Sequence, residues 1–576
     1  MKFFKKINNN KKTFFLLFAT SSLLVGCTEY LDVDTDTDNS TKAPLNFLLS
    51  NIEISTSQIG DYNVNSGQIF GVYTHQMCAR DEEDQYGVKV DNIPMQNDWN
   101  GIYTTLTDIE DLIKFGTESQ NRVYVGVGQL HKAYLMSVAV DLWGDVPFTE
   151  ATKLREGIRN PKFDNQKAIY AAIFNLISEG KANIASNSGL QKPGADDFFY
   201  GGSVTKWVKF ANTFKLKLYN QTRLTTDFDQ VGLDALIAEN NFFTSNADDF
   251  EFTHYNNIAK SNERNRLYRE SYESTQFGSY QSPWFYEILK GVNTNIHTGN
   301  PDPRMKYYFY TQLENGVFPP DQGNAATGNP RADYWDKSTG FFSIRFGSTG
   351  PDRDASAENS YTYPGIFLCG GRYDDDLRYR NAAGTVITVD ASAGTGAAPR
   401  RILTYDEMLY IQAELIQVGK LTGNAGTKLQ SAIVASFAKV DKVVANAKTS
   451  SQVIPILSSS ASVTTFLSKI STEFNAATTA KKLEIIMTQK WVGTAGDPLD
   501  QYTDYRRTNY PTLVDPNGTA PEYQLNNADG FPINDSQTVV NNPYQVSLFW
   551  PQSELNSNNK APGQKNPGTY KIFWDN

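Results

Sequence analysis

Hydrophobic positions recur with helical spacing over two long stretches of the chain, about residues 45–240 and about 404–495. In the first stretch, Trp207, Phe210, Phe214 and Leu218 fall on one stripe of a helix, with Lys206, Lys209 and Lys217 toward the other side. The run 123–151 begins as a helix too apolar for an exposed face and is predicted to be buried on most sides, with Gly144 and Pro147 near its end. Short connections between such helices predict stacked helical hairpins.

The pattern changes between about residues 245 and 400. This stretch is rich in Gly, Pro, Asn, Asp and aromatic residues, which predicts long loops with short strands. Helical spacing resumes at Thr404, where Thr404 and Glu407 have the spacing of a capping box, and Gly419 is placed to end that helix. From about residue 497 the chain is rich in Pro and Asn and is predicted to be irregular. Long loops on a rigid scaffold commonly hold binding residues.

The first 26 residues have the layout of a bacterial secretion signal. Five lysines precede a mostly apolar run of 13 residues, Thr13–Val25, which is too short to span a bilayer. Leu24-Val25-Gly26-Cys27 resembles a lipobox, in which the signal is cut before a cysteine that then carries lipid. The alternative is an ordinary signal peptide with a coincidental cysteine. Residues 27–44 are acidic and polar, which predicts a flexible tether between the lipid in the membrane and a body that begins near residue 45.

Charge and cysteine content narrow the class of protein. Cleavage before Cys27 removes five lysines and no acid, so the formal net charge changes from −10 to −15 over the remaining 550 residues. An acidic chain is a poor partner for nucleic acid or for a phosphate-rich membrane face. Cys78 and Cys369 are too few for a disulfide framework; separate buried thiols are favoured over a single bridge.

Motifs for metal and cofactor chemistry are weak. The four histidines are isolated, and neither a P-loop nor a G-x-S-x-G sequence occurs. An EF-hand loop starting at Asp32 would need Gly and Glu where Thr37 and Ala43 stand. The acids of Asp374–Asp376 and of residues 81–84 are interpreted as a solvated turn and a charged exposed loop. No cofactor is expected; calcium remains possible without being indicated.

Six stretches together resemble the SusD/RagB family of nutrient-binding outer-membrane lipoproteins of Bacteroidetes. They are the Cys27 lipobox, VDLWGDVPFTEA (140–151), WVKFANTFKLKLY (207–219), LTYDEMLYIQAELI (403–416), DYRRTNYP (504–511) and LFWPQSELNSNN (548–559). The resemblance implies a mainly α fold, with a tetratricopeptide-like scaffold of helical hairpins and a loop-rich, partly β variable region. It implies one such domain over residues 45–576. In these motifs Trp143, Trp207 and Glu414 are interpreted as scaffold residues rather than ligand contacts.

The resemblance also implies a function without catalysis. Such lipoproteins work with a SusC-like TonB-dependent transporter, capturing an oligosaccharide or a peptide and delivering it for import. The acids Glu29 and Asp32 resemble the signal that exports such lipoproteins to the cell surface. The expected location is therefore the outer membrane, with attachment through the N-terminal lipid.

Candidate ligand residues follow from the chemistry of sugars. Sugar rings stack on exposed aromatic rings, and neighbouring polar side chains bind the hydroxyls. Residues of these types in the loop-like stretches are Asp81, Tyr86, Trp99, Trp284, Arg331, Asp333, Tyr334, Trp335 and Asp336. The cluster 329–337 is preferred because it places Arg331, Asp333 and Asp336 beside two adjacent rings. The alternative for each ring is a packing role.

Two other functions remain open. A secreted helical glycoside hydrolase would need two carboxylates at a set distance, and sequence alone cannot nominate a pair among 63 acids. A surface adhesin or structural lipoprotein would lack a small-ligand pocket. Within the binding hypothesis, the aromatic loops favour a glycan, whereas the acidic charge leaves open a cationic peptide bound by a RagB-like lipoprotein.

Overall fold

A computed structural model describes residues 42–62, 64–79, 82–274, 278–320, 334–348, 359–526, 538 and 540–575. Cys27 and the predicted tether up to residue 41 lie outside the described residues. In the part of the chain that is described, no helix combines the length and apolar character needed to cross a membrane.

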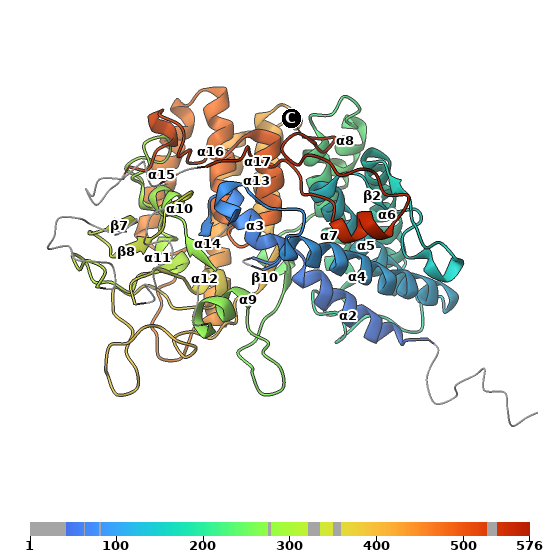
Figure 1. Cartoon of the computed structure of the whole chain (residues 1–576), viewed down its shortest axis with the longest axis horizontal. Helices are drawn as coiled ribbons and strands as arrows, with labels where there is room; N and C mark the ends of the chain where they lie inside the picture. The colour runs from blue at the N-terminus through green and yellow to red at the C-terminus, as the bar shows by residue number, and fades with distance from the viewer. Residues whose placement is uncertain are drawn as a thin grey trace, which may run out of the picture.

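Most helices of the first stretch pack in a row at one end of the molecule, whereas the short helix Ser66–Tyr73 lies near the centre, beside the second stretch (Figure 1). The members of the first stretch are α2 (Leu45–Gln58), α3 (Ser66–Tyr73), α4 (Ile93–Glu118), α5 (Arg122–Trp143), α6 (Gln166–Ala185), α7 (Val204–Thr222) and α8 (Gln230–Glu239). Helix α5 packs between α4 and α6, and α6 packs on α7. As predicted, α5 is buried almost throughout and ends at Gly144, whose φ of 76° suits glycine.

The second helical stretch lies beside the first and extends from the centre of the view toward its left side (Figure 1). It comprises α13 (Tyr405–Gln417), α14 (Ala425–Ala447), α15 (Ala461–Ala476) and α16 (Thr479–Gly493), and α17 (Pro498–Thr508) follows. Helix α13 packs on α14, α16 and α7, which joins the two stretches. The fold is therefore mainly α, built of paired helices. Helix α17 lies where the sequence predicts irregular structure, because its charged residues are buried in ion pairs and hide the helical pattern.

The capping box predicted at the start of α13 is wrong. The Thr404 hydroxyl makes no cap hydrogen bond and instead donates to the Asp406 carboxylate at 2.7 Å. Glu407 is buried and faces Lys490, with 3.5 Å between the charged groups. The helix C-terminus is as predicted, since Gly419 follows it with a φ of 73°.

The middle of the chain consists of loops, short helices and two-stranded antiparallel pairs, as the sequence predicts. The pairs are β1 (Met77–Ala79) with β5 (Ser279–Gln281), β4 (Phe250–Phe252) with β10 (Arg400–Leu403), β6 (Phe309–Tyr310) with β9 (Tyr363–Pro364) and β7 (Tyr334–Asp336) with β8 (Phe341–Ser343); β2 (Val146–Pro147) pairs with β3 (Phe163–Asp164) near α5. The short helices are α9 (Arg266–Tyr268), the π-helix η4 (Arg269–Glu273), α10 (Pro283–Lys290), α11 (Met305–Tyr308) and α12 (Ile366–Cys369).

The C-terminal segment runs back over the N-terminal helices (Figure 1). It includes α18 (Gln552–Ser557). Its Trp550 ring nitrogen donates to the Asp145 carbonyl at 3.0 Å, and its Trp574 ring nitrogen donates to the Asp141 carboxylate at 2.9 Å. The WGDVP motif is thus the place where the two ends of the fold meet, which confirms a packing role for Trp143, a fully buried side chain.

Interior contacts confirm most of the scaffold predictions. Trp207, Phe210, Phe214 and Leu218 are all buried. Lys217 departs from the prediction of an outward-facing lysine, because it turns inward to pair with the buried Asp500. Both Cys78 and Cys369 are buried free thiols, as predicted.

Candidate functional site

Some of the sequence-predicted ligand residues lie outside the described residues. They are Asp81, Arg331 and Asp333. The lipidation site Cys27 is also outside. The ligand-binding roles assigned to the three charged residues stay predictions.

The other candidate rings were expected on exposed loops, and the structure corrects this expectation. Trp99 is in α4 and packs edge-on against Trp143, with ring centroids 5.2 Å apart. Trp284 is in α10, and its ring nitrogen donates to the Thr512 carbonyl at 3.1 Å. Both rings are at most 3% exposed. Their faces are used for packing, so they offer no surface to a sugar in this conformation.

The described candidates of the preferred cluster, at 334–336, are buried as well. Tyr334, Trp335 and Asp336 form strand β7, and none is more than 3% exposed. The Tyr334 hydroxyl donates to the Glu287 carboxylate at 2.8 Å. Asp336 accepts from the Tyr286 hydroxyl and is paired with Lys290. These polar groups already have partners, since apolar surroundings demand them.

Tyr86 lies in a separate environment. It has a left-handed φ of 52°, and its hydroxyl is 2.8 Å from Nε2 of His75. Its ring packs edge-on against Tyr544 and against Tyr73. The structure therefore distributes the described candidates over several packed environments instead of bringing them into one site. The burial of Glu83 and Asp84 in the same segment also corrects the interpretation of residues 81–84 as an exposed charged loop.

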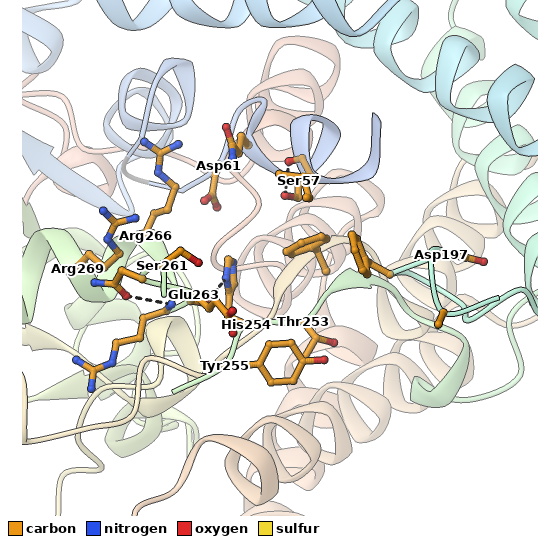
Figure 2. A pocket seen from close by; sticks show the side chains of 17 residues that line it. Ser57, Asp61, Asp197, Thr253, His254, Tyr255, Ser261, Glu263, Arg266 and Arg269 are labelled. Carbon is orange, nitrogen blue, oxygen red and sulfur yellow. Dashed lines mark hydrogen bonds between the residues drawn. The ribbon is translucent and has the colours of Figure 1, made fainter. Parts of the chain in front are cut away.

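A pocket of about 810 Å³ opens elsewhere in the described structure (Figure 2). Its size is that of small-ligand sites in proteins. Four segments line it: the end of α2, residues 195–198 before α7, residues 252–255 after β4, and residues 261–269 leading into α9 and η4. The lining residues are Ile54, Ser57, Gln58, Asp61, Ala195, Asp197, Phe198, Phe252, Thr253, His254, Tyr255, Ser261, Asn262, Glu263, Arg264, Arg266 and Arg269.

Backbone pairing holds the walls of this pocket in place. Strand β4 pairs with β10, with Phe252 opposite Arg400. Asn265 fixes the start of α9: its backbone N–H donates to Gly396, its side-chain amide donates to Ala398, and its side-chain oxygen caps the Leu267 N–H. Asparagine is well suited to such an N-cap position. The arginine-bearing segment is therefore anchored to the residues before β10.

Three arginines lie on the pocket wall, and they differ in their partners. Arg264 is occupied: its guanidinium is 2.8 Å from the Glu273 carboxylate and 2.7 Å from the Asn256 side-chain oxygen. Arg266 is half-buried and Arg269 is exposed. Within the described residues, neither Arg266 nor Arg269 forms an ion pair or a side-chain hydrogen bond. Figure 2 shows both on the same side of the pocket, away from Asp197.

Two of the three acids on the wall are committed to the scaffold. The Asp61 carboxylate is 3.2 Å from Nε of Arg400. Asp197 accepts hydrogen bonds from the Phe199, Tyr200 and Gly202 backbone N–H groups and from the Trp207 ring at 2.7 Å. Glu263 has no such contact to its carboxylate among the described residues. The free charges facing the pocket are thus two cations and one anion.

His254 supplies a neutral polar group. Its Nδ1 is 3.1 Å from the Glu263 carbonyl, so Nδ1 carries the proton that makes this hydrogen bond and Nε2 is an acceptor. Nε2 has no partner within the described structure. Burial lowers the pKa of His254, so the imidazole is uncharged at neutral pH.

Aromatic rings complete the pocket. Tyr255 is 59% exposed and Phe198 is 41% exposed, and Phe198 packs edge-on against Phe252. Exposed rings beside hydrogen-bonding groups can bind the apolar faces and the hydroxyls of a sugar. The sequence does not single out Phe198 and Tyr255, because aromatic residues are plentiful in this chain and no local pattern marks these two as exposed. The available signal was three arginines within six residues, 264–269, in the loop-rich stretch.

A buried trio of acids, Glu407, Asp497 and Asp500, is surrounded by cationic side chains. Their carboxylate oxygens lie within 4.8 Å of one another. The neighbouring cations Lys217, Lys490 and Arg400 pair with Asp500, Glu407 and Asp497 respectively. These side chains already supply the positive charge that a metal would bring.

Comparison with known proteins identifies the family. The sequence matches the SusD-like family described as "Starch-binding associating with outer membrane" over residues 37–330 and 348–532. The chain belongs to the SusD-like family. No curated protein matches it.

Solved structures show the same fold as this SusD-like chain. A SusD homolog from Bacteroides fragilis has 17% identity and a TM-score of 0.62, with 92% of this chain and 99% of that chain covered. A chitin-binding protein has 20% identity and a TM-score of 0.64, with 92% and 100% covered. A chitin-binding SusD homolog from Flavobacterium johnsoniae has 16% identity and a TM-score of 0.59, with 92% and 98% covered. At these identities the likeness establishes the fold.

Proposed function

We propose that the protein is a cell-surface lipoprotein that captures an oligosaccharide and delivers it to a SusC-like TonB-dependent outer-membrane transporter. The observation that carries the ligand class is the pocket of about 810 Å³ with exposed rings at Tyr255 and Phe198. The family description and the chitin-binding relatives support a carbohydrate.

Binding without catalysis fits the acids of this pocket. Hydrolysis of a glycosidic bond commonly uses two carboxylates, one as acid and one as base or nucleophile. Asp61 and Asp197 are held by scaffold donors, which leaves Glu263 as the one described pocket acid with a free carboxylate. The helical glycoside hydrolase is therefore the weaker proposal.

The test of binding is a calorimetric titration of the lipid-free chain, residues 28–576, with a panel of oligosaccharides and peptides, followed by product analysis. Saturable binding of an oligosaccharide without product supports the proposal. Turnover of the oligosaccharide would contradict binding without catalysis and favour the glycoside hydrolase. Binding confined to peptides would show that the ligand is a peptide instead of an oligosaccharide.

Location and partner need a separate test. Cys27→Ser removes the sulfur to which lipid would be attached. We expect the wild-type chain in the outer-membrane fraction, accompanied by a TonB-dependent transporter on mild extraction, and the variant in the soluble fraction. Equal membrane retention of the variant would contradict attachment through the lipid.

A further inference from the structure

We infer that the ligand is an acidic oligosaccharide, whose carboxylate or sulfate group binds to Arg266 and Arg269. This inference rests on the proposed function and adds the charge of the ligand to it. It starts from two guanidiniums, three residues apart, that lie on one side of the pocket without an ion-pair partner among the described residues (Figure 2).

Several arginines elsewhere in the described interior are paired with carboxylates, whereas Arg401 and Arg506 donate to backbone carbonyls. Arg304 pairs with Asp302 at 2.6 Å, Arg223 pairs with Glu414 at 2.7 Å, and even Arg264 on the same wall pairs with Glu273. The whole chain carries 63 acids against 53 basic residues, so acidic partners are plentiful. Two neighbouring cations left without one in a concave site form a ready receptor for an anion.

The chemistry of the guanidinium specifies what kind of anion fits. Its planar fork of N–H donors matches a carboxylate, and it binds the oxygens of sulfate or phosphate in the same way. Tyr255 and Phe198 are exposed in the same pocket, and such rings stack on sugar faces. Together these groups suit an oligosaccharide bearing uronic acid or sulfate, in contrast to neutral chitin.

The negative net charge of the chain and the carboxylate of Glu263 oppose this binding, but both effects are too weak to prevent it. The formal net charge of the lipid-free chain, residues 28–576, is −15, but exposed charges farther away than about 10 Å are largely screened at 0.1 M salt. Within the pocket, Glu263 is the free acid that an anionic ligand would meet. One acid against two cations leaves a positive balance, and it predicts that removing the Glu263 charge strengthens binding.

The experiment uses the lipid-free chain and four probes in calorimetry. They are a galacturonate oligosaccharide, a sulfated carrageenan oligosaccharide, a neutral chitin oligosaccharide and a short peptide with a free C-terminal carboxylate. The variants are Arg266→Gln with Arg269→Gln, and Glu263→Gln. The matched control is Arg155→Gln with Arg159→Gln, which removes the same charge from two exposed arginines of another surface. Thermal unfolding confirms that each variant is folded.

We expect an acidic oligosaccharide to bind at least about tenfold more tightly than the neutral one, with affinity that falls as salt rises. The affinity for the acidic oligosaccharide should fall at least about tenfold in the Arg266/Arg269 variant and rise a few-fold in Glu263→Gln. The control should bind as tightly as wild type. Whether the carboxylate or the sulfate probe binds identifies the anion.

Other results overturn the inference and separate it from the proposed function. Tight binding of the neutral oligosaccharide, unchanged in the Arg266/Arg269 variant, would reject the acidic ligand and keep the proposed function. Binding of the peptide alone, lost in that variant, would keep the anion site and reject the oligosaccharide. Absence of binding to every probe would contradict both.

Discussion

Arg507 on α17 donates to the carboxylate of Glu414 on α13, 93 residues earlier in the chain, with both side chains fully buried. Arg223, the residue that caps the C-terminus of α7, binds the same carboxylate at 2.7 Å, and Arg507 also pairs with Asp504. One acid thereby joins three helices of the scaffold. Burial alone would raise the pKa of Glu414, but the two arginines outweigh burial and hold the pKa well below its ordinary value.

Glu414→Gln should destabilise the fold strongly. The substitution leaves two buried guanidiniums with one carboxylate fewer, and breaking a buried pair from one side commonly costs about 3–5 kcal/mol. Urea denaturation measures the free energy of unfolding of each variant. Glu118→Gln is the control, because Glu118 pairs with Lys42 at an exposed site and its loss should change nothing measurable. Equal effects of the two substitutions would contradict the central role of Glu414.

Asp141 should make stability depend on pH. Burial raises the pKa of Asp141 to about 6, although the Tyr170 hydroxyl, the Trp574 ring and nearby cations favour the charged form. A carboxyl with a higher pKa in the folded chain stabilises the fold while protonated, and that contribution is lost as pH rises through about 6. Asp141→Asn should therefore stabilise the protein above pH 6 by up to about 3 kcal/mol.

The comparison that checks this prediction is the difference in unfolding free energy between Asp141→Asn and wild type, measured from pH 4 to pH 8. Other titrating groups cancel in the difference. It should be near zero at the acidic end and grow through pH 6; a difference that is constant with pH would show that the Asp141 charge is not the cause.

Gly144→Ala tests the contact between the WGDVP motif and the C-terminal segment. A Cβ at position 144 would lie 2.5 Å from the Tyr570 ring, at a φ of 76° that strains any residue with a side chain. Gly157 has a similar φ of 87° and open space around it. Gly157→Ala should cost about 1 kcal/mol for the backbone, and Gly144→Ala at least about 1 kcal/mol more. Similar losses in melting temperature would refute a tight contact at Tyr570.

Trp284→Phe separates packing from ligand contact. The substitution removes the ring nitrogen that donates to the Thr512 carbonyl and leaves a gap in α10 packing. We expect a loss of about 1–3 kcal/mol in stability and an unchanged dissociation constant for the ligand. A folded variant with weakened binding would restore Trp284 as a ligand residue.

The scaffold could be predicted from the sequence because its signals are local. The stripe Trp207, Phe210, Phe214 and Leu218 specifies one buried helix face wherever that helix packs, and the apolar run of α5 specifies burial all round. Helix α17 was missed because buried charges such as Arg507 give no apolar periodicity.

The pocket could not be predicted in the same way. Its walls come from residues 54–61, 195–198, 252–255 and 261–269, and only the fold brings these four segments together. Whether a ring in an irregular segment is exposed depends on equally distant partners. Trp284, for example, is covered by a segment 228 residues later. The composition therefore predicts that aromatic residues contact the ligand, but it does not identify which rings are exposed.

The most direct test of the account is the dissociation constant of the bound oligosaccharide for wild type and for Phe198→Ala combined with Tyr255→Ala. Both rings are more than 40% exposed, so their removal should leave stability nearly unchanged. Tyr523→Ala, at a ring 39% exposed outside the pocket, is the control. We predict that the double variant binds at least about tenfold more weakly and that the control binds as tightly as wild type. Unchanged affinity in the double variant would contradict the pocket as the ligand site.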